Sequence, residues 1–320
     1  MSRFPFPHPY GWFQVAYPDD LEPGGVKALQ YWSADLVLWR DEAGEYHLQD
    51  AFCPHLGAHL GKGGHVSDGA ITCPFHGWRF DGGGTCLEIP YSEKVNRKAR
   101  LRTYPVVVRN GFVLAWRHPD PEIAPMWEVE EIEEIGDAGW SEYYSSEYVI
   151  KTVPQEMMEN SADPAHFLYV HGTETVAEVE KYDTDGPCSV MLSKQSYVTP
   201  RGTTWGRIDV YNYGPGFSKV WFSGIVDAIN IATTTPIDDE TCIVRFNFTV
   251  RKFEDEALTS TVASAFVKEI NKQVVEDTPI WENKVFLPVP ALADTDGPIL
   301  KFRKWYSQFY AEPMKEFSGS

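Results

Sequence analysis

The sequence lacks several features that define common classes of protein. It has no apolar run long enough to span a bilayer, and residues 1–13 lack the charged and apolar segments of a signal peptide. We therefore expect a soluble, cytoplasmic protein without a membrane span. Cations are few, with 28 Lys and Arg against 46 Asp and Glu, which gives a formal net charge of −18. Because phosphate binding requires clustered cations, this balance argues against nucleic acid as a partner.

Cysteine is also scarce. There are five cysteines, an odd and scattered set that does not resemble the disulfide framework of a secreted protein. Free thiols in a reducing compartment fit better. The chain shows no internal repeat, and its 320 residues exceed the usual size of one domain, so two domains are expected.

The first 120 residues predict an all-β domain of short strands and glycine-rich loops. Residues 35–40 and 46–52 have the pattern of a hairpin, and Asn110-Gly111 is a strong tight-turn signal between two further strands. Residues 121–140 are rich in proline and acidic residues, which indicates a connection between domains.

Residues 141–320 predict an α+β domain with an internal pocket. A strand pattern over 143–153 and a helical stretch near 155–169 come first. Long strands follow between 190 and 251, and a long helix spans about 254–283.

The first metal-binding pattern lies in the all-β part. Cys53-Pro54-His55 is followed, after seventeen residues, by Cys73-Pro74-Phe75-His76. Two cysteines and two histidines can hold zinc or a Rieske iron–sulfur cluster. Zinc sites usually keep like ligands together, whereas each short segment here supplies one thiolate and one imidazole. The spacing therefore favours a [2Fe-2S] cluster, with the thiolates on one iron and the imidazoles on the other.

The second pattern is Glu159-x3-Asp163-x2-His166-x4-His171. Two histidines and one carboxylate around an iron with open positions are typical of oxygen-activating ferrous enzymes. The two histidines lie about 140° apart on a regular helix, so His171 has to follow the helix end near Gly172. Glu159, Asp163 and His166 are predicted to share one helical face. Asp163-Pro164 also has the pattern of a helix cap followed by proline.

The last helix offers the third ligand. Leu258, Val262, Phe266, Ile270 and Val274 recur every four residues, and Asp277 continues this apolar stripe. A lone carboxylate on a buried stripe is costly unless it is paired or metal-bound. Pro279 should disturb the helix close by. A cap after a kink is the alternative role for Asp277, and Glu276 and Glu282 are alternative ligands.

Together these motifs resemble those of the Rieske non-haem iron oxygenase family. The resemblance implies a [2Fe-2S] cluster on Cys53, His55, Cys73 and His76. It also implies Fe(II) on His166, His171 and Asp277, with O2 as cosubstrate, and a C-terminal helix-grip (START-like) domain with an antiparallel sheet. Respiratory Rieske proteins carry two extra cysteines, and the corresponding places here are Ala58 and Phe75.

The resemblance further implies a head-to-tail homotrimer, in which Asp163 links one subunit's cluster histidine to a neighbour's iron ligand. It implies a ferredoxin or a flavin-containing NAD(P)H reductase as electron donor. The basic run 94–102 is a hypothetical docking segment for that donor, and a solvated strand face is the alternative.

The segments 53–61, 296–299 and 303–310 resemble the branch with 3-ketosteroid 9α-hydroxylases and sterol desaturases, which implies monooxygenation of a hydrophobic, polycyclic, steroid-like substrate. Dihydroxylation of an aromatic ring, oxidative demethylation and a pure electron-transfer role are the alternatives, as is structural zinc in place of the cluster. Six aromatic residues on the strands are candidates for the substrate pocket, although such residues are more often core: Tyr197, Tyr211, Tyr213, Phe217, Trp221 and Phe222.

Overall fold

The computed structural model describes residues 3–199, 202–224 and 226–311, the side chains of 197–199 excepted. The chain divides into an all-β unit, Tyr10–Val129, and an α+β unit made of the described residues of 1–9 and 130–320. The predicted α+β fold class is confirmed. The division falls inside the predicted connection, and the boundaries 1–120, 121–140 and 141–320 stay a prediction. The N-terminal segment joins the second unit because Phe4 packs against Val153 and Phe286.

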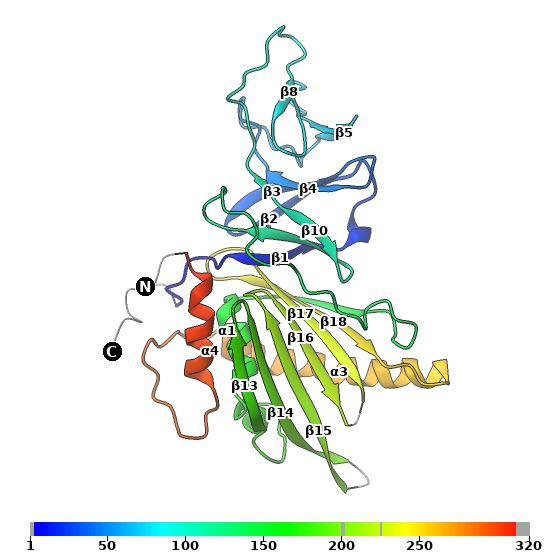
Figure 1. Ribbon diagram of the computed structural model, residues 1–320, viewed down its shortest axis with the longest axis vertical. Helices are drawn as coiled ribbons and strands as arrows, with labels where there is room; N and C mark the ends of the chain where they lie inside the picture. Colours follow the sequence, from blue (N-terminus) through cyan, green and yellow to red (C-terminus); the bar gives the residue numbers. More distant parts are fainter. Residues whose placement is uncertain (1–2, 200–201, 225, 312–320) are drawn as a thin grey trace. The chain divides into compact units, whose positions relative to one another are not determined.

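The all-β unit consists of three antiparallel sheets, with the strand orders β1-β11-β10, β2-β3-β4-β9 and β5-β6-β7-β8 (Figure 1). The bounds of its elements are β1 Gly11–Ala16, η1 Pro18–Asp20, β2 Val26–Tyr31, β3 Ala34–Arg40, β4 Tyr46–Asp50, β5 His65–Ser67, β6 Ala70–Thr72, β7 Arg79–Phe80, β8 Cys86–Glu88, β9 Thr103–Tyr104, β10 Val106–Arg109 and β11 Phe112–Arg117. Both predicted hairpins are confirmed, as β3 with β4 and β10 with β11. Asn110 and Gly111 have φ angles of 55° and 81°, as a tight turn between strands requires.

Two loops of this unit carry the predicted cluster ligands. The first Cys/His loop, 53–58, lies between β4 and β5, and the second, 73–78, lies between β6 and β7. Both cysteines belong to a buried apolar cluster that includes Trp39, Ile71 and Phe80. This core fixes the base of each loop, so the loop positions follow from ordinary apolar packing.

The α+β unit is built on one antiparallel seven-stranded sheet, in the order β12-β18-β17-β16-β15-β14-β13. Figure 1 shows the long helix α3 running across one face of this sheet. The bounds of its strands are β12 Tyr144–Ile150, β13 Glu178–Asp185, β14 Cys188–Thr199, β15 Gly202–Tyr213, β16 Phe217–Ser223, β17 Ala228–Pro236 and β18 Cys242–Val250. The bounds of its helices are α1 Pro154–Glu159, η2 Asn160–Ala162, α2 His166–Tyr169, α3 Glu256–Trp281, α4 Ile299–Tyr306 and η3 Ser307–Phe309.

Helix α3 begins after Asp255, whose side chain accepts hydrogen bonds from the first-turn amides. It continues through Pro279 to Trp281, so the proline does not end it. The buried stripe is shifted at its N-terminal end from the predicted one, since Leu258 is 46% exposed and Thr259 is buried. The C-terminal end of the stripe is as predicted, since Asp277 and Trp281 are buried, at 6% and 4% exposure. Helix α4, which packs against α1, was not predicted.

The helical stretch 154–169 is broken at Asp163, which has an extended conformation with φ −108° and ψ 94°. Pro164 causes the break, because the residue before a proline is disfavoured in the helical region. The predicted common face of Glu159, Asp163 and His166 is therefore wrong. Glu159 instead forms a buried bidentate ion pair with Arg303 of α4, with N–O distances of 2.5 and 2.6 Å.

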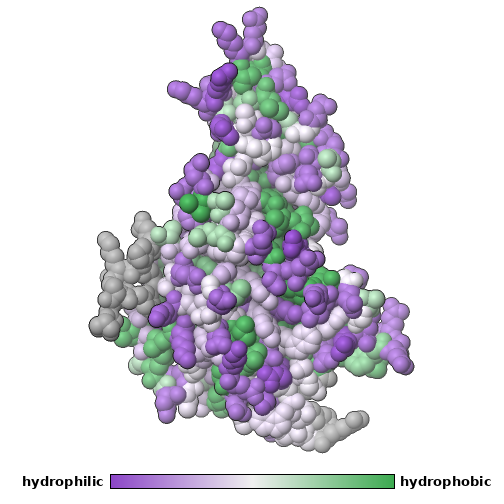
Figure 2. All heavy atoms as spheres, viewed as in Figure 1, coloured by the Kyte–Doolittle hydropathy of each residue, from purple (hydrophilic) through white to green (hydrophobic). Residues whose placement is uncertain are grey.

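Polar and charged residues cover much of the visible face, with hydrophobic patches between them (Figure 2). Among the exposed apolar side chains are Leu56 and Phe75 of the Cys/His loops, at 65% and 62%. Within the described ranges, the helices lack the combination of length and apolar character that crossing a bilayer requires.

Candidate metal centres

The two Cys/His loops are closed by the same pair of backbone hydrogen bonds. In the first loop, Cys53 N donates to Ala58 O at 2.9 Å and Gly57 N donates to Cys53 O at 2.9 Å. The corresponding distances in the second loop are 2.8 and 3.1 Å. Gly57 and Gly77 occupy equivalent places with φ angles of 75° and 72°, a region that favours glycine. The loops therefore present two similar turns, each with one thiol and one imidazole.

The structure pairs thiol with thiol and imidazole with imidazole. Cys53 and Cys73 are both 3% exposed, and the rings of His55 and His76 lie 4.7 Å apart. Burial raises the pKa of Cys53 to about 11; the Cys73 thiol adds to this, and a backbone hydrogen bond at His55 opposes it. Two neighbouring buried thiols ionise readily only beside a compensating cation, such as a metal ion.

His76 supplies a second sign that these residues suit a metal group. Its Nδ1 atom is buried and has no hydrogen-bond partner among the described residues. A buried imidazole nitrogen without a partner is costly, and a metal ion would satisfy it. His55 is held from the other side by Trp78, whose ring stacks on it at 4.5 Å with an interplanar angle of 7°. The four predicted ligands thus fit a [2Fe-2S] cluster.

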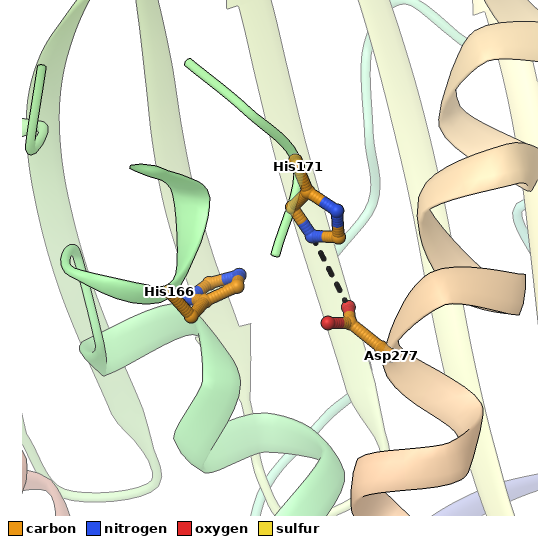
Figure 3. Close-up of side chains that lie close together, drawn as sticks. All are labelled: His166, His171 and Asp277. Atoms are coloured by element: carbon orange, nitrogen blue, oxygen red, sulfur yellow. Dashed lines mark ion pairs between the residues drawn. The ribbon is translucent and has the colours of Figure 1, made fainter. Parts of the chain in front are cut away.

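In the α+β unit, the side chains of His166, His171 and Asp277 converge. One ligand atom from each lies within 4.8 Å of the others, and His171 Nε2 is 3.4 Å from Asp277 Oδ2 (Figure 3). His166 opens α2 and His171 follows its end, while Asp277 comes from α3. The expectation that His171 lies beyond the helix end is confirmed. Two imidazoles and one carboxylate form a set suited to ferrous iron with open positions.

Polar neighbours hold this cluster in place. Asn160 Nδ2 lies 3.2 Å from His166 Nε2 and donates to Asp277 Oδ2 at 3.1 Å. His166 Nδ1 contacts the backbone carbonyl of Asp163 at 2.5 Å. Asn160 was not identified from the sequence, because its position in η2 depends on the helix break at Asp163 and follows no motif.

The two histidines differ in their electrostatic surroundings. Burial lowers the pKa of His166. Burial also disfavours the charged form of His171, but hydrogen bonds to Asp277 and Glu276 outweigh it and leave its pKa raised. The neutral imidazole is the form that binds a metal, so His166 is the better prepared of the two.

The alternative carboxylates lie outside the three-residue cluster. Glu276 Oε2 is 3.0 Å from His171 Nδ1, the ring nitrogen that faces away from Asp277. Glu282 Oε1 accepts a hydrogen bond from Lys151 N at 3.3 Å. The geometry therefore favours Asp277 as the third ligand, and Glu276 as the residue that orients His171.

Asp163 has the cap geometry. Its Oδ1 atom accepts hydrogen bonds from Ala165 N at 3.0 Å and His166 N at 3.3 Å. Oδ2 accepts no hydrogen bond within the described part of the chain. Asp163 is also predicted to link a cluster histidine of one subunit to the iron ligand of its neighbour. That second role stays a prediction.

An apolar cavity of about 160 Å³ adjoins the three-residue cluster, whose members line its wall. A second cavity of about 530 Å³ lies next to it. The cavity at the three-residue cluster is called the inner cavity, and the second one the outer cavity. The residues that line both cavities are Phe167, His171, Ile208, Phe222, Ile270 and Gln273. The inner cavity alone is below the ~300–1,000 Å³ usual for small-molecule sites, and the two together fall within that range.

Four of the aromatic residues predicted for the pocket do not line either cavity: Tyr211, Tyr213, Phe217 and Trp221. The prediction for them is wrong because side chains alternate along a strand. Ile208 and Val210 of β15 face the inner cavity, as do Val220 and Phe222 of β16, so their odd-numbered neighbours face away. Trp221, for instance, packs edge-on against another tryptophan at 5.5 Å.

Phe222 lines both cavities, as predicted. The side chain of Tyr197 lies outside the described part of the chain. To separate the aromatic residues that line a cavity from those that do not, one has to know which face of the sheet meets α3, and the sequence alone does not show this.

Two family models match the chain. The Rieske [2Fe-2S] domain matches residues 11–105, and the 3-ketosteroid 9alpha-hydroxylase C-terminal domain matches residues 115–310. The chain is 31% identical to cholesterol 7-desaturase nvd 1 of Ciona intestinalis, over 95% of this chain and 69% of that protein. It is 29% identical to the oxygenase component of 3-ketosteroid-9-alpha-monooxygenase of Rhodococcus rhodochrous, over 94% and 84%.

Solved structures share the fold. Apo dicamba monooxygenase has a TM-score of 0.72 at 18% identity, over 95% of this chain and 97% of that one. NdmB of Pseudomonas putida CBB5 has a TM-score of 0.74 at 19% identity, over 92% and 89%. At such low identity the likeness supports the fold alone.

Proposed function

The chain belongs to the Rieske oxygenases with a 3-ketosteroid 9alpha-hydroxylase C-terminal domain, and from this we propose that it hydroxylates a hydrophobic, polycyclic, steroid-like substrate. As a member of this family it is an oxidoreductase, the terminal oxygenase component of its system, with a [2Fe-2S] cluster, a non-haem iron and O2 as cosubstrate. One observation carries the proposal. The His166, His171 and Asp277 cluster lines an apolar cavity.

The steroid-like substrate class rests on the relatives and on the cavity walls. The relatives are named for cholesterol and for 3-ketosteroids. The inner cavity has walls of aliphatic and aromatic side chains, among them Val210, Val220 and Phe222. Such walls bind a fused-ring hydrocarbon by removing its surface from water.

We assign Cys53, His55, Cys73 and His76 to the cluster, and His166, His171 and Asp277 to the mononuclear iron. When bound, the cluster supplies electrons one at a time and the iron activates dioxygen. Asn160 holds the Asp277 carboxylate through its hydrogen bond to Oδ2. Glu276 orients His171 from the opposite ring nitrogen. The cavity walls exclude water and hold the substrate against the ligand face.

A head-to-tail homotrimer remains part of the proposal. Leu56 and Phe75 are exposed beside the cluster histidines, and exposed apolar groups often mark protein contacts. Asp163 would link a cluster histidine of one subunit to His166 of the next through Oδ2. If so, the variant D163A should keep its iron and its trimer, as measured by light scattering, and lose electron transfer to the iron in single-turnover experiments. Unchanged transfer would remove Asp163 from the route.

The electron donor is proposed to be a ferredoxin or a flavin-containing NAD(P)H reductase in the cytoplasm. Lys94, Arg97 and Lys98 are exposed in a loop, and Arg100 is exposed in an isolated bridge with Thr85, so these cations do not form one strand face. The double variant K98E/R100E should slow donor-dependent turnover several-fold and leave the substrate Kd unchanged. The matched control is K268E on the exposed side of α3. Equal kinetics in both variants would discard this docking segment.

Product analysis under labelled dioxygen tests the reaction. Steroids and polycyclic aromatics should be supplied with a surrogate reductase, and one labelled oxygen atom per product is expected. Two labelled atoms would indicate dihydroxylation instead, and a lost methyl group would indicate oxidative demethylation. If the protein converts neither steroids nor polycyclic aromatics, the proposed substrate class is wrong.

Spectroscopy tests the metals separately. The reduced protein should give the rhombic electron paramagnetic resonance signal of a Rieske cluster. A colourless zinc protein would contradict the cluster assignment. Iron restricted to the all-β unit would favour the alternative of an electron-transfer protein.

A further inference from the structure

Gln195 of β14 is the unusual residue of the outer cavity. Its side chain lines that cavity and is 1% exposed. Neither Nε2 nor Oε1 has a hydrogen-bond partner among the described residues. A buried amide with both polar atoms unsatisfied is unfavourable, and such a group in a native structure calls for a ligand or an ordered water.

The residues around Gln195 leave room for a ligand. Gly206 is its cross-strand partner on β15 and has no side chain. Ser193, two residues earlier on the same strand face, donates its hydroxyl to Ile208 O at 2.6 Å and is satisfied within the protein. The unpaired amide is therefore specific to Gln195 and is not a general property of this strand.

The position of Gln195 relative to the metal ligands follows from the strand register. Gly206 lies opposite Gln195, Ile208 lines both cavities, and Val210 lines only the inner one. At ~3.3 Å per residue, Gly206 and Val210 are about 13 Å apart along β15. His171 lines both cavities as well. An elongated molecule can thus extend from the ligand cluster to Gln195.

We propose that Gln195 determines substrate specificity by binding an oxygen substituent, a ketone or a hydroxyl, at the end of the substrate remote from the oxidised carbon. This inference rests on the proposed function, because it deepens the substrate class to polycyclic molecules with a polar end. The amide Nε2 donates to the substrate oxygen, and Oε1 accepts from a hydroxyl where one is present. A site built to pair with a polar group rejects the analogue that lacks it.

The test compares the wild-type protein with Q195M, which keeps the side-chain length and removes both polar atoms. Two ligands are used, a 3-ketosteroid and the same steroid with the ketone reduced to a methylene. Their Kd values are measured by isothermal titration calorimetry on the metal-loaded protein, and the hydroxylated carbon is identified by mass spectrometry and nuclear magnetic resonance. The control is S193A, because Ser193 lies on the same strand face as Gln195 but lines neither cavity.

We expect Q195M to raise the Kd of the ketosteroid at least tenfold and to change that of the methylene analogue less than twofold. The product of Q195M should be a mixture of positional isomers. Its Tm should be equal to or higher than that of the wild type, because an unsatisfied buried amide is removed. S193A should lower Tm and keep the wild-type ratio of the two Kd values.

Two results would overturn the assignment in different ways. If the wild type hydroxylates the ketosteroid while Q195M binds both ligands as the wild type does, an ordered water satisfies Gln195 and the proposed function stands. If the wild type binds neither steroid, the substrate class is wrong and the role of Gln195 falls with it.

Discussion

His171 lies between two consecutive carboxylates of α3, with its Nδ1 atom 3.0 Å from Glu276 Oε2 and its Nε2 atom 3.4 Å from Asp277 Oδ2. Neighbouring residues on a helix point about 100° apart, so both reach one imidazole only because the ring stands between them. The sequence pair Glu276-Asp277 thus combines a candidate ligand with the residue that orients another ligand.

Loss of Glu276 should weaken iron binding without removing a ligand. We expect E276A to lower iron affinity about 10–100-fold, as loss of a hydrogen-bond partner to a ligating histidine typically does. E276Q should show a smaller effect, since its amide oxygen still accepts a hydrogen bond from Nδ1. Iron retained against a chelator series measures this. K272A, which removes the other ion-pair partner of Glu276, is the control, and an equal loss of iron in K272A would contradict the orienting role.

Gly84 and Gly83 offer a matched pair in the all-β unit. A Cβ at Gly84 would lie 2.3 Å from the backbone oxygen of Leu101, and Gly84 has a φ of +76°. A Cβ at Gly83 would meet only the Asp81 side chain, at 3.4 Å. We expect G84A to lose about 2 kcal/mol or more of stability and part of its visible cluster absorbance, and G83A to lose less than about 0.5 kcal/mol. Similar thermal unfolding of the two variants would refute the close approach.

The strand register predicts a contrast between two aromatic residues. Phe222 lines both cavities, whereas Tyr211 lies on the opposite face of the sheet. F222A should raise the KM for a polycyclic substrate about 10–100-fold, because an apolar contact of about 1.5–3 kcal/mol is lost. Y211A should leave KM unchanged. Steady-state kinetics on the two variants measures both KM values. A larger increase in KM for Y211A than for F222A would show that the strand register is wrong.

The ion pair between Glu159 and Arg303 should matter for stability. Both side chains are buried, at 7% and 6% exposure. Removing one charge leaves the other unpaired, so E159Q should cost about 3–5 kcal/mol, and E159Q/R303M should recover part of that loss. D183N breaks an exposed pair with Lys181 and should cost less than about 1 kcal/mol. Denaturant unfolding measures all three, and a small effect of E159Q would show that the pair is solvated.

The parts predicted well from the sequence were those with local signals. Turn residues such as Asn110-Gly111 specify a hairpin without help from the rest of the chain. The metal motifs place one thiol and one imidazole in each of two short loops, and the pairing of like groups follows once the loops meet. Asp277, which lies close to His166 and His171, was singled out because a lone acidic residue continues an apolar helical stripe and because the family resemblance implies a ligand there; its role as a ligand stays a prediction.

The parts that failed depend on tertiary information. Tyr211 and Trp221 are aromatic residues on strands, and alternation alone does not say which face meets a helix. Helical periodicity predicts a common face for Glu159 and His166, but Pro164 keeps the preceding residue out of the helical region and breaks the helix. Asn160 and Gln195 belong to no motif, and only their surroundings in the fold identify them.

The break before Pro164 has a chemical consequence for His166. In an unbroken helix, the carbonyl of Asp163 would accept from the amide four residues later, whereas here it faces the imidazole Nδ1. That contact fixes the neutral tautomer with its hydrogen on Nδ1 and leaves the lone pair of Nε2 directed to the metal position. A proline that is not itself a candidate ligand thereby determines which nitrogen of the histidine can bind a metal.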